Sequence, residues 1–206
     1  MSRSIRILLI LLAWVVLTTP AFAKRNNPDI RLEYRPQQEV AVASADVTRD
    51  MLERPVELRV EDARPGDEPA EIGTRTDDAD RLHTLRSVGE VGEYVTEVLG
   101  DLAADWGLRD EDGADLVLDV ALIRFKIVET NQAVGATFNA EARLSGELRE
   151  RGGEVLWSGT AAGDATRYGK KFSNENVNEV LSDALLEAFA ELLSDGGLHD
   201  AWRAGE

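Results

Sequence analysis

The sequence predicts a two-layer α+β domain: an antiparallel-rich sheet of about four strands, covered on one face by two amphipathic helices. Three observations lead to this prediction. Apolar and polar residues alternate along 134–148, a glycine-containing turn follows at 150–154, and 155–166 runs back, which is typical of a β-hairpin. Apolar residues recur at helical spacing along 91–106 and again along 177–192. The expected order of elements is β-α-β-β-β-α.

The N-terminus has the parts of a secretory signal peptide. Arg3 and Arg6 precede an apolar run at 7–17, and small residues up to Ala23 fit the site that signal peptidase reads. The apolar run is short for a bilayer-spanning helix, and an uncleaved N-terminal anchor is the alternative. We expect a signal peptide at 1–23, cleaved after Ala23, and a periplasmic mature protein without a transmembrane segment. A peripheral association with a membrane is compatible with this location.

Three parts are expected behind the signal peptide. Residues 24–50 form a polar lead-in with little periodicity, interrupted by a short extended piece at 30–34 and a weak strand at 40–43. Residues 51–198 form the single α+β domain, and 199–206 form a C-terminal tail.

The composition excludes several kinds of function. The chain has no cysteine, which excludes disulfides, a thiol nucleophile, thiolate metal sites and lipid attachment at a cysteine. Loss of Arg3 and Arg6 with the signal peptide leaves 21 basic and 39 acidic residues, a net charge of −18. Such a surface repels nucleic-acid backbones and anionic lipid headgroups, so nucleic-acid binding is disfavoured. The acids serve solubility in the simplest interpretation, and binding of basic partners or cations is the alternative.

The first part of the domain contains one clear strand. Apolar and charged residues alternate along 56–61, and the strand ends where proline and glycine follow at 62–66. Residues 66–86 are rich in Asp, Glu and Thr and are expected to form a long solvated loop, with a short strand at 72–76 inside it.

The first helix is expected to begin near Ser87, because Ser87 and Glu90 have the spacing of a capping box. Gly107 is a plausible C-terminal stop. Trp106, the last apolar residue of the helical stripe, is expected to close the core at the helix end.

The next strand changes its apolar face part of the way along. The apolar residues that alternate along 116–122 lie at even-numbered positions, whereas Ile123, Phe125 and Ile127 lie at odd-numbered positions. A β-bulge would return these three residues to the core. Alternatively, the strand passes beyond the sheet and Ile123, Phe125 and Ile127 form a partner surface.

The second strand of the hairpin has very small residues on its inner face from Gly159 to Ala165, which would let a helix approach the backbone closely. The amphipathic segment at 177–192 is that helix, with Ser173 or Asn174 as its cap and glycines at 196–197 as its end. Trp202 in the tail is expected to fold back onto the domain.

No segment has a convincing catalytic, cofactor-binding or metal-binding pattern. Residues 163–171 lie where a phosphate loop would lie, but the glycine spacing is one residue too long and Lys171 replaces the hydroxyl that would hold magnesium. His83 and His199 are far apart and have no second ligand at metal-binding spacing. Residues 110–115 resemble half of a calcium loop without the later glutamate. We therefore expect a non-enzymatic protein without cofactor or metal.

Two stretches resemble the YajG-like family of small bacterial envelope proteins. Residues 171–184, followed by Leu198 and His199, resemble its last helix and end. Residues 56–65 and 72–75 resemble its first strand, Asp-x-Arg turn and following segment. The resemblance covers about 56–202.

Members of this family are typically outer-membrane lipoproteins without established enzymatic activity, so the resemblance implies an envelope protein. The missing lipobox cysteine favours a free periplasmic form. The features that carry over are structural: Asp62 and Arg64 in the turn, and Phe172 and Asn176 at the helix start. Arg64 is expected to pair with a carboxylate, and Asn176 to cap the helix or fix the loop before it.

The sequence thus favours a non-enzymatic accessory or binding protein of the cell envelope, which associates with other envelope proteins by its sheet edge or loops. The alternative is a periplasmic carrier of a small ligand, with a pocket between helices and sheet.

Overall fold

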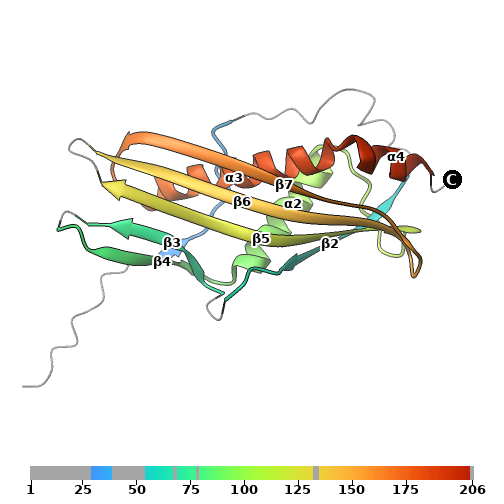
Figure 1. Cartoon of the computed structure of the whole chain (residues 1–206), viewed down its shortest axis with the longest axis horizontal. Coiled ribbons are helices and arrows are strands. Elements are labelled where there is room, and N and C mark those ends of the chain that lie inside the picture. Colours follow the sequence, from blue (N-terminus) through green and yellow to red (C-terminus); the bar gives the residue numbers. More distant parts are fainter. Residues whose placement is uncertain (1–28, 39–53, 67–68, 78, 132–134, 205–206) are drawn as a thin grey trace, which may run out of the picture.

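The computed structural model describes residues 29–38, 54–66, 69–77, 79–131 and 135–204. These residues form seven strands and three helices in one domain (Figure 1). In chain order the elements are β1 (Asp29–Arg31), β2 (Val56–Asp62), β3 (Glu71–Thr76), β4 (Leu82–Val88), α2 (Val91–Asp105), β5 (Leu116–Asn131), β6 (Ala136–Glu150), β7 (Val155–Lys170), α3 (Asn174–Leu193) and α4 (Gly196–Ala204).

All seven strands belong to one sheet, with the order β1-β4-β3-β5-β6-β7 and with β2 beside β5. Strands β5, β6 and β7 pair antiparallel along nearly their whole length (Figure 1). Strands β3 and β4 form a second antiparallel pair, and β1 adds to β4 in parallel. The predicted α+β class is confirmed, but the predicted numbers of strands and helices were too low.

β5 is long enough to pair with two different strands along one edge. β2 runs parallel to residues 116–122 of β5, and β3 runs parallel to residues 127–129. The register between β5 and β6 shifts between Leu122 and Arg124, which leaves Ile123 as the extra residue of a β-bulge. One edge of β5 therefore has a gap, between the end of β2 and the start of β3.

The helices pack on a single face of the sheet (Figure 1). α3 contacts β5, β6 and β7, α2 contacts β2, and α4 contacts β6 and β7. Trp202, Phe138 and Phe189 are the largest fully buried side chains of this core, and burial of such a side chain contributes about 1.5–3 kcal/mol. The small inner residues of β7 have the predicted role, because a Cβ on Gly163 would lie 2.0 Å from the carbonyl oxygen of Ala184 in α3.

The two ends of α2 differ in how well the sequence predicts them. The helix begins at Val91 after Glu90, and no side chain caps it. Ser87 belongs to β4, where its hydroxyl donates to a neighbouring backbone carbonyl, so the predicted capping box was wrong. At the other end, Trp106 stacks on Phe189 with 5.4 Å between ring centroids, and its predicted core role is confirmed.

Residues 31–38 lie along α3 and are held by polar side chains of that helix. Asn178, Ser182 and Asp183 bond successive backbone positions of this segment at 2.8, 2.9 and 2.7 Å. These contacts explain why three polar residues lie on the buried face of α3. The predicted extended piece at 30–34 is confirmed only in part, because β1 ends at Arg31 and residues 32–34 are not in a strand.

Three further segments differ from their predictions. β4 lies in the region predicted as a solvated loop, where its only buried residues are Leu85 and Ser87. The predicted tail is α4, which begins at Gly196 and buries Trp202. The strand β7 continues to Lys170, so the segment that resembles a phosphate loop is not a loop.

The predicted signal peptide at 1–23 and the predicted weak strand at 40–43 lie outside the described residues. In the part of the chain that the structure describes, no helix is both long enough and apolar enough to cross a membrane.

Candidate binding cleft

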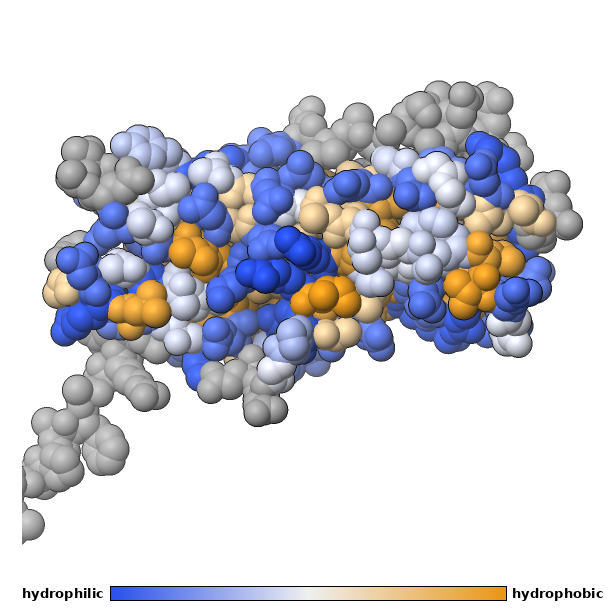
Figure 2. All heavy atoms as spheres, viewed as in Figure 1, coloured by the Kyte–Doolittle hydropathy of each residue, from blue (hydrophilic) through white to orange (hydrophobic). Residues whose placement is uncertain are grey.

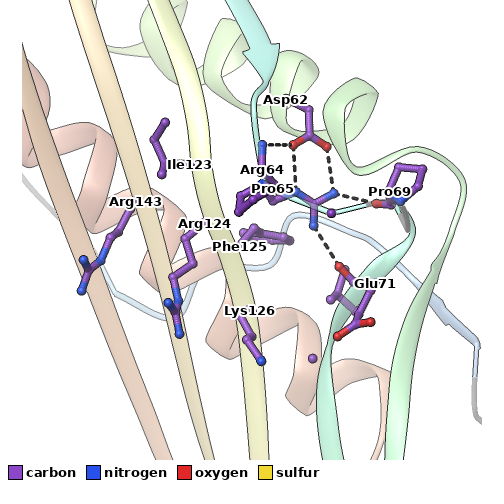
Figure 3. A pocket seen from close by; sticks show the side chains of 13 residues that line it. Asp62, Arg64, Pro65, Pro69, Glu71, Ile123, Arg124, Phe125, Lys126 and Arg143 are labelled. Carbon is purple, nitrogen blue, oxygen red and sulfur yellow. Dashed lines mark hydrogen bonds and ion pairs between the residues drawn. The ribbon is translucent and has the colours of Figure 1, made fainter.

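The gap in the edge of β5 opens into a cleft of about 940 Å³ (Figure 3). Its walls come from the end of β2, the start of β3 and described residues between them, from the bulged part of β5, and from one residue of β6. The lining residues are Asp62, Arg64, Pro65, Gly66, Pro69, Glu71, Ile72, Gly73, Ile123, Arg124, Phe125, Lys126 and Arg143.

Arg64 ties together the backbone on one side of the cleft. Its Nε and Nη2 donate to the two carboxylate oxygens of Asp62, both at 2.8 Å. Nη1 donates to the carbonyl of Glu71 at 2.9 Å, and Nη2 also donates to the carbonyl of Pro69 at 2.6 Å. The Arg64 side chain is only 11% exposed. The predicted pairing of Arg64 with a carboxylate is confirmed, and all three guanidinium nitrogens are engaged in holding the turn.

The ionisation of Asp62 reflects this arrangement. Burial alone would raise its pKa, but the hydrogen bonds and the charge of Arg64 outweigh that effect and hold the pKa of Asp62 below its ordinary value. The Asp62–Arg64 pair is therefore a structural crosslink between the end of β2 and the start of β3, with both partners charged.

A cluster of three cations lines the other side of the cleft; we refer to Arg124, Lys126 and Arg143 as the cation cluster. Arg124 and Arg143 face each other across β5 and β6, and the Nε of each lies 2.6 Å from a different carboxylate oxygen of Glu141. Lys126 is the cross-strand neighbour of Glu141. Figure 3 shows the two arginine side chains together, with Lys126 next along β5. With Glu141 included, the local charge is +2.

Figure 2 shows a hydrophilic patch at the centre of this face of the sheet, with one hydrophobic group directly beside it and others nearer both ends. A second cleft of about 590 Å³ lies on it, lined by Arg59, Val60, Glu61, Asp119, Val120, Ala121, Ser145 and Glu147. Three of these residues are acidic and one is basic, so the two clefts differ in charge.

The predicted partner surface is only partly exposed. Phe125 is 2% exposed and Ile127 is fully buried, because the bulge turns both side chains toward the helices. These two residues belong to the core, so their assignment to a partner surface was wrong. Ile123, the bulged residue itself, is 39% exposed and lines the cleft.

The other predicted structural residues lie at a different place, at the start of α3. The Phe172 ring packs under the Arg75 guanidinium at 4.0 Å and beside Phe138. Asn176 donates from its side chain to the carbonyl of Lys171 at 2.6 Å, so it fixes the loop, while Ser173 is the cap.

The structure thus brings Asp62, Arg64, Ile123 and Phe125 to one cleft and leaves Ile127, Phe172 and Asn176 outside it. The sequence analysis did not single out the cation cluster. Each cation lies on the polar side of its strand, as the alternation predicts. Their convergence depends on the register between β5 and β6, which alternation cannot supply.

Two observations bear on chemistry and on the carrier alternative. Among the described residues, no three His, Asp or Glu side chains are arranged to hold a metal ion. Neither cleft is lined by a residue of a helix. Helix α3 packs directly against the backbone of β7 at Gly163. The pocket that the carrier alternative places between helices and sheet is therefore not found over β7.

No family model matches the sequence, and no curated protein matches it. Among solved structures, a protein of the DUF330 family from Xanthomonas campestris is similar with a TM-score of 0.55 and 12% identity, over 86% of this chain and 98% of that chain. A candidate lipoprotein from Caulobacter crescentus is similar with a TM-score of 0.41 and 16% identity, over 78% and 97%. A lipoprotein from Neisseria meningitidis has a TM-score of 0.25 and 14% identity, over 60% and 90%.

The first of these similarities extends over nearly the whole of the Xanthomonas protein and shows that the two chains share a fold. The other two TM-scores are too low to argue from. The resemblance to the YajG-like family stays a prediction.

Proposed function

We propose that this chain is a non-enzymatic binding protein of the bacterial cell envelope, which engages its partner through the uncovered face of its sheet at the cleft beside β5. The observation that carries the proposal is the cation cluster. In a chain with a formal charge of −16, the cation cluster and Arg64 line one cleft beside a gap in the sheet edge.

The location in the envelope is supported by the signal-peptide pattern at 1–23 and by the resemblance to the YajG-like family of residues 56–65, 72–75 and 171–184, with Leu198 and His199. Membership of that family is part of the proposal. Without a lipobox cysteine, the protein is proposed to be free in the periplasm.

The non-enzymatic character is supported by how the candidate catalytic groups are used. His83 contacts Asp77 at 2.8 Å, and His199 contacts the carbonyl of Leu193 at 2.6 Å. Asp62 is paired with Arg64, so each of these three groups already has a partner within the fold.

A site-specific crosslinking experiment in cells tests this proposal. A photoreactive amino acid replaces Ile123, which is exposed in the cleft, and in a second strain replaces Glu97, which is exposed on α2. We expect an envelope component to crosslink at position 123 and not at position 97.

The substitution Arg143→Gln in the strain with the probe at position 123 is expected to reduce this product, because it removes one cation from the cleft. The proposal is wrong if position 123 gives no product, or only the products that position 97 gives.

A further inference from the structure

The cation cluster has unused hydrogen-bonding capacity. The Nε atoms of Arg124 and Arg143 each lie 2.6 Å from Glu141. Each guanidinium group has five N–H donors, so one shared carboxylate cannot engage them all. Lys126, the cross-strand neighbour of Glu141, adds a third cation beside them. One carboxylate therefore fixes two guanidinium groups side by side and leaves their outer donors available.

The charge and geometry of this cluster indicate the kind of ligand. Resting on the binding role proposed above, we infer that the cleft beside β5 binds an organic phosphate, with the phosphate group on Arg124, Arg143 and Lys126. The cation cluster and Glu141 sum to +2, which matches a phosphate monoester of charge about −1.5 to −2 near pH 7. Arg64, Asp62 and Glu71 also line the cleft and bring the total to +1. Arginine also fits phosphate better than lysine does, because its planar fork donates two parallel hydrogen bonds.

The net negative charge of the chain favours a small phosphate-bearing molecule over a polyanion as the ligand. A polyanion such as nucleic acid, or an anionic membrane surface, would also meet the acidic surface around the cleft and be repelled by it. A single phosphate group on the cation cluster covers little of that surface, although Asp62 and Glu71 also line the cleft.

The apolar part of the wall accommodates the organic group of the ligand. Ile123 is 39% exposed and lines the cleft together with Pro65 and Pro69, which are also exposed. The volume of about 940 Å³ lies within the range of about 300–1,000 Å³ that small-molecule sites occupy. The cleft is therefore amphipathic, with cations on one side and apolar side chains beside them.

Calorimetric titration of the protein purified from the periplasm, after expression of the full chain, tests this inference. The probes are hexyl phosphate, inorganic phosphate and hexanoate, at low salt and about pH 7.5. We expect hexyl phosphate to bind most tightly, because only this probe combines a dianion with an apolar chain. Its affinity should fall at about pH 5.5, where the phosphate loses its second charge.

Matched variants locate the binding site. Arg143→Gln is expected to weaken hexyl phosphate about tenfold, since it removes charge-assisted hydrogen bonds to the phosphate. Arg109→Gln is the control, because Arg109 also pairs with one glutamate, Glu111, at 2.6 Å but lies outside the cleft. Circular dichroism of both variants confirms that they are folded.

Four results would overturn the inference. Equal binding of hexanoate would show that the cleft does not select phosphate. Equal binding of inorganic phosphate would show that the organic group adds nothing. An equal loss of affinity in Arg109→Gln would place the binding elsewhere. If hexyl phosphate fails to bind while position 123 still crosslinks an envelope component, the ligand class is wrong and the binding role stands.

Discussion

Two glycines show how strongly the effect of a residue depends on what surrounds it. Gly163 lies in β7 directly under α3, where a Cβ would lie 2.0 Å from the Ala184 oxygen and 2.5 Å from the Ala188 nitrogen. Gly100 lies inside α2, and a Cβ there would meet no atom within 4 Å. An alanine methyl group would therefore overpack the site of Gly163. At Gly100 it would only reduce the conformational freedom of the backbone.

We predict opposite effects for alanine at these two positions. Gly163→Ala should lower the free energy of unfolding by about 1–3 kcal/mol, because backbone atoms of α3 must move away. Gly100→Ala should raise it by up to about 1 kcal/mol, because glycine is a poor helix former. Urea unfolding measures both values. A neutral Gly163→Ala would mean that α3 does not lie as close to β7 as the structure shows.

At the scale of elements, the bulge at Ile123 decides which face of β5 is buried. Before the bulge Leu118, Val120 and Leu122 point to the helices, and after it Phe125 and Ile127 do. Since side chains alternate with period two, only the one extra residue lets both sets reach the same core. The bulge also lies beside the gap in the sheet edge, so one residue shapes both the core and the cleft.

Deletion of Ile123 is therefore expected to unfold the domain. Without the extra residue, the apolar residues on one side of position 123 must point to solvent, at a cost that exceeds about 5 kcal/mol. Ile123→Thr keeps the bulge and changes an exposed side chain, so it should alter stability by only about 0.5 kcal/mol. Circular dichroism and urea unfolding compare the two. A stably folded deletion variant would show that β5 can slip in register.

At the scale of the whole molecule, Glu57 connects parts of the chain that are distant in sequence. Its carboxylate accepts from the backbone N–H of Gly113 at 3.1 Å and pairs with Arg59 and Arg151. The Gly113 hydrogen bond, followed by those of Arg59 and Arg151, lowers the pKa of Glu57 from 4.5 to about 2. Strand β2, the turn before β5 and the turn after β6 thus meet at one carboxylate.

This pKa shift predicts part of the acid sensitivity of the fold. Because the pKa is lower in the folded state, Glu57 stabilises the fold fully above pH 4.5, and that contribution is lost as the pH falls from 4.5 toward about 2. Glu57→Gln should therefore lose less stability than the natural protein over this interval. The urea midpoint measured against pH tests this, with Glu97→Gln as the control. Parallel curves for Glu57→Gln and the natural protein would contradict it.

Much of the fold could be predicted from periodicity, and the residues that escaped prediction have physical reasons in common. β4 was missed because only Leu85 and Ser87 of its seven residues are buried, which leaves little alternation to detect. The helix α4 was taken for a tail because its glycines at 196–197 also fit the end of a helix.

The candidate cleft was predictable only in pieces. The Asp62–Arg64 turn and the parity change at Ile123 are visible in the sequence, and the structure places both in the cleft. The role of Arg143 is not visible, because it depends on which residue of β5 lies opposite it. That pairing is set by side-chain packing across the whole sheet.

The sequence by itself determined the α+β class, the long antiparallel hairpin, the change of apolar face at Ile123 and the close packing of the last helix on small residues. Each of these follows from local alternation, helical spacing or side-chain size, which the order of residues contains directly. The tertiary structure alone decided that β2 and β3 share one edge of β5, that a cleft opens between them, and that three cations meet beside it. Contacts between segments so distant in the chain are selected by the free energy of the complete fold and leave no periodic pattern in any one segment.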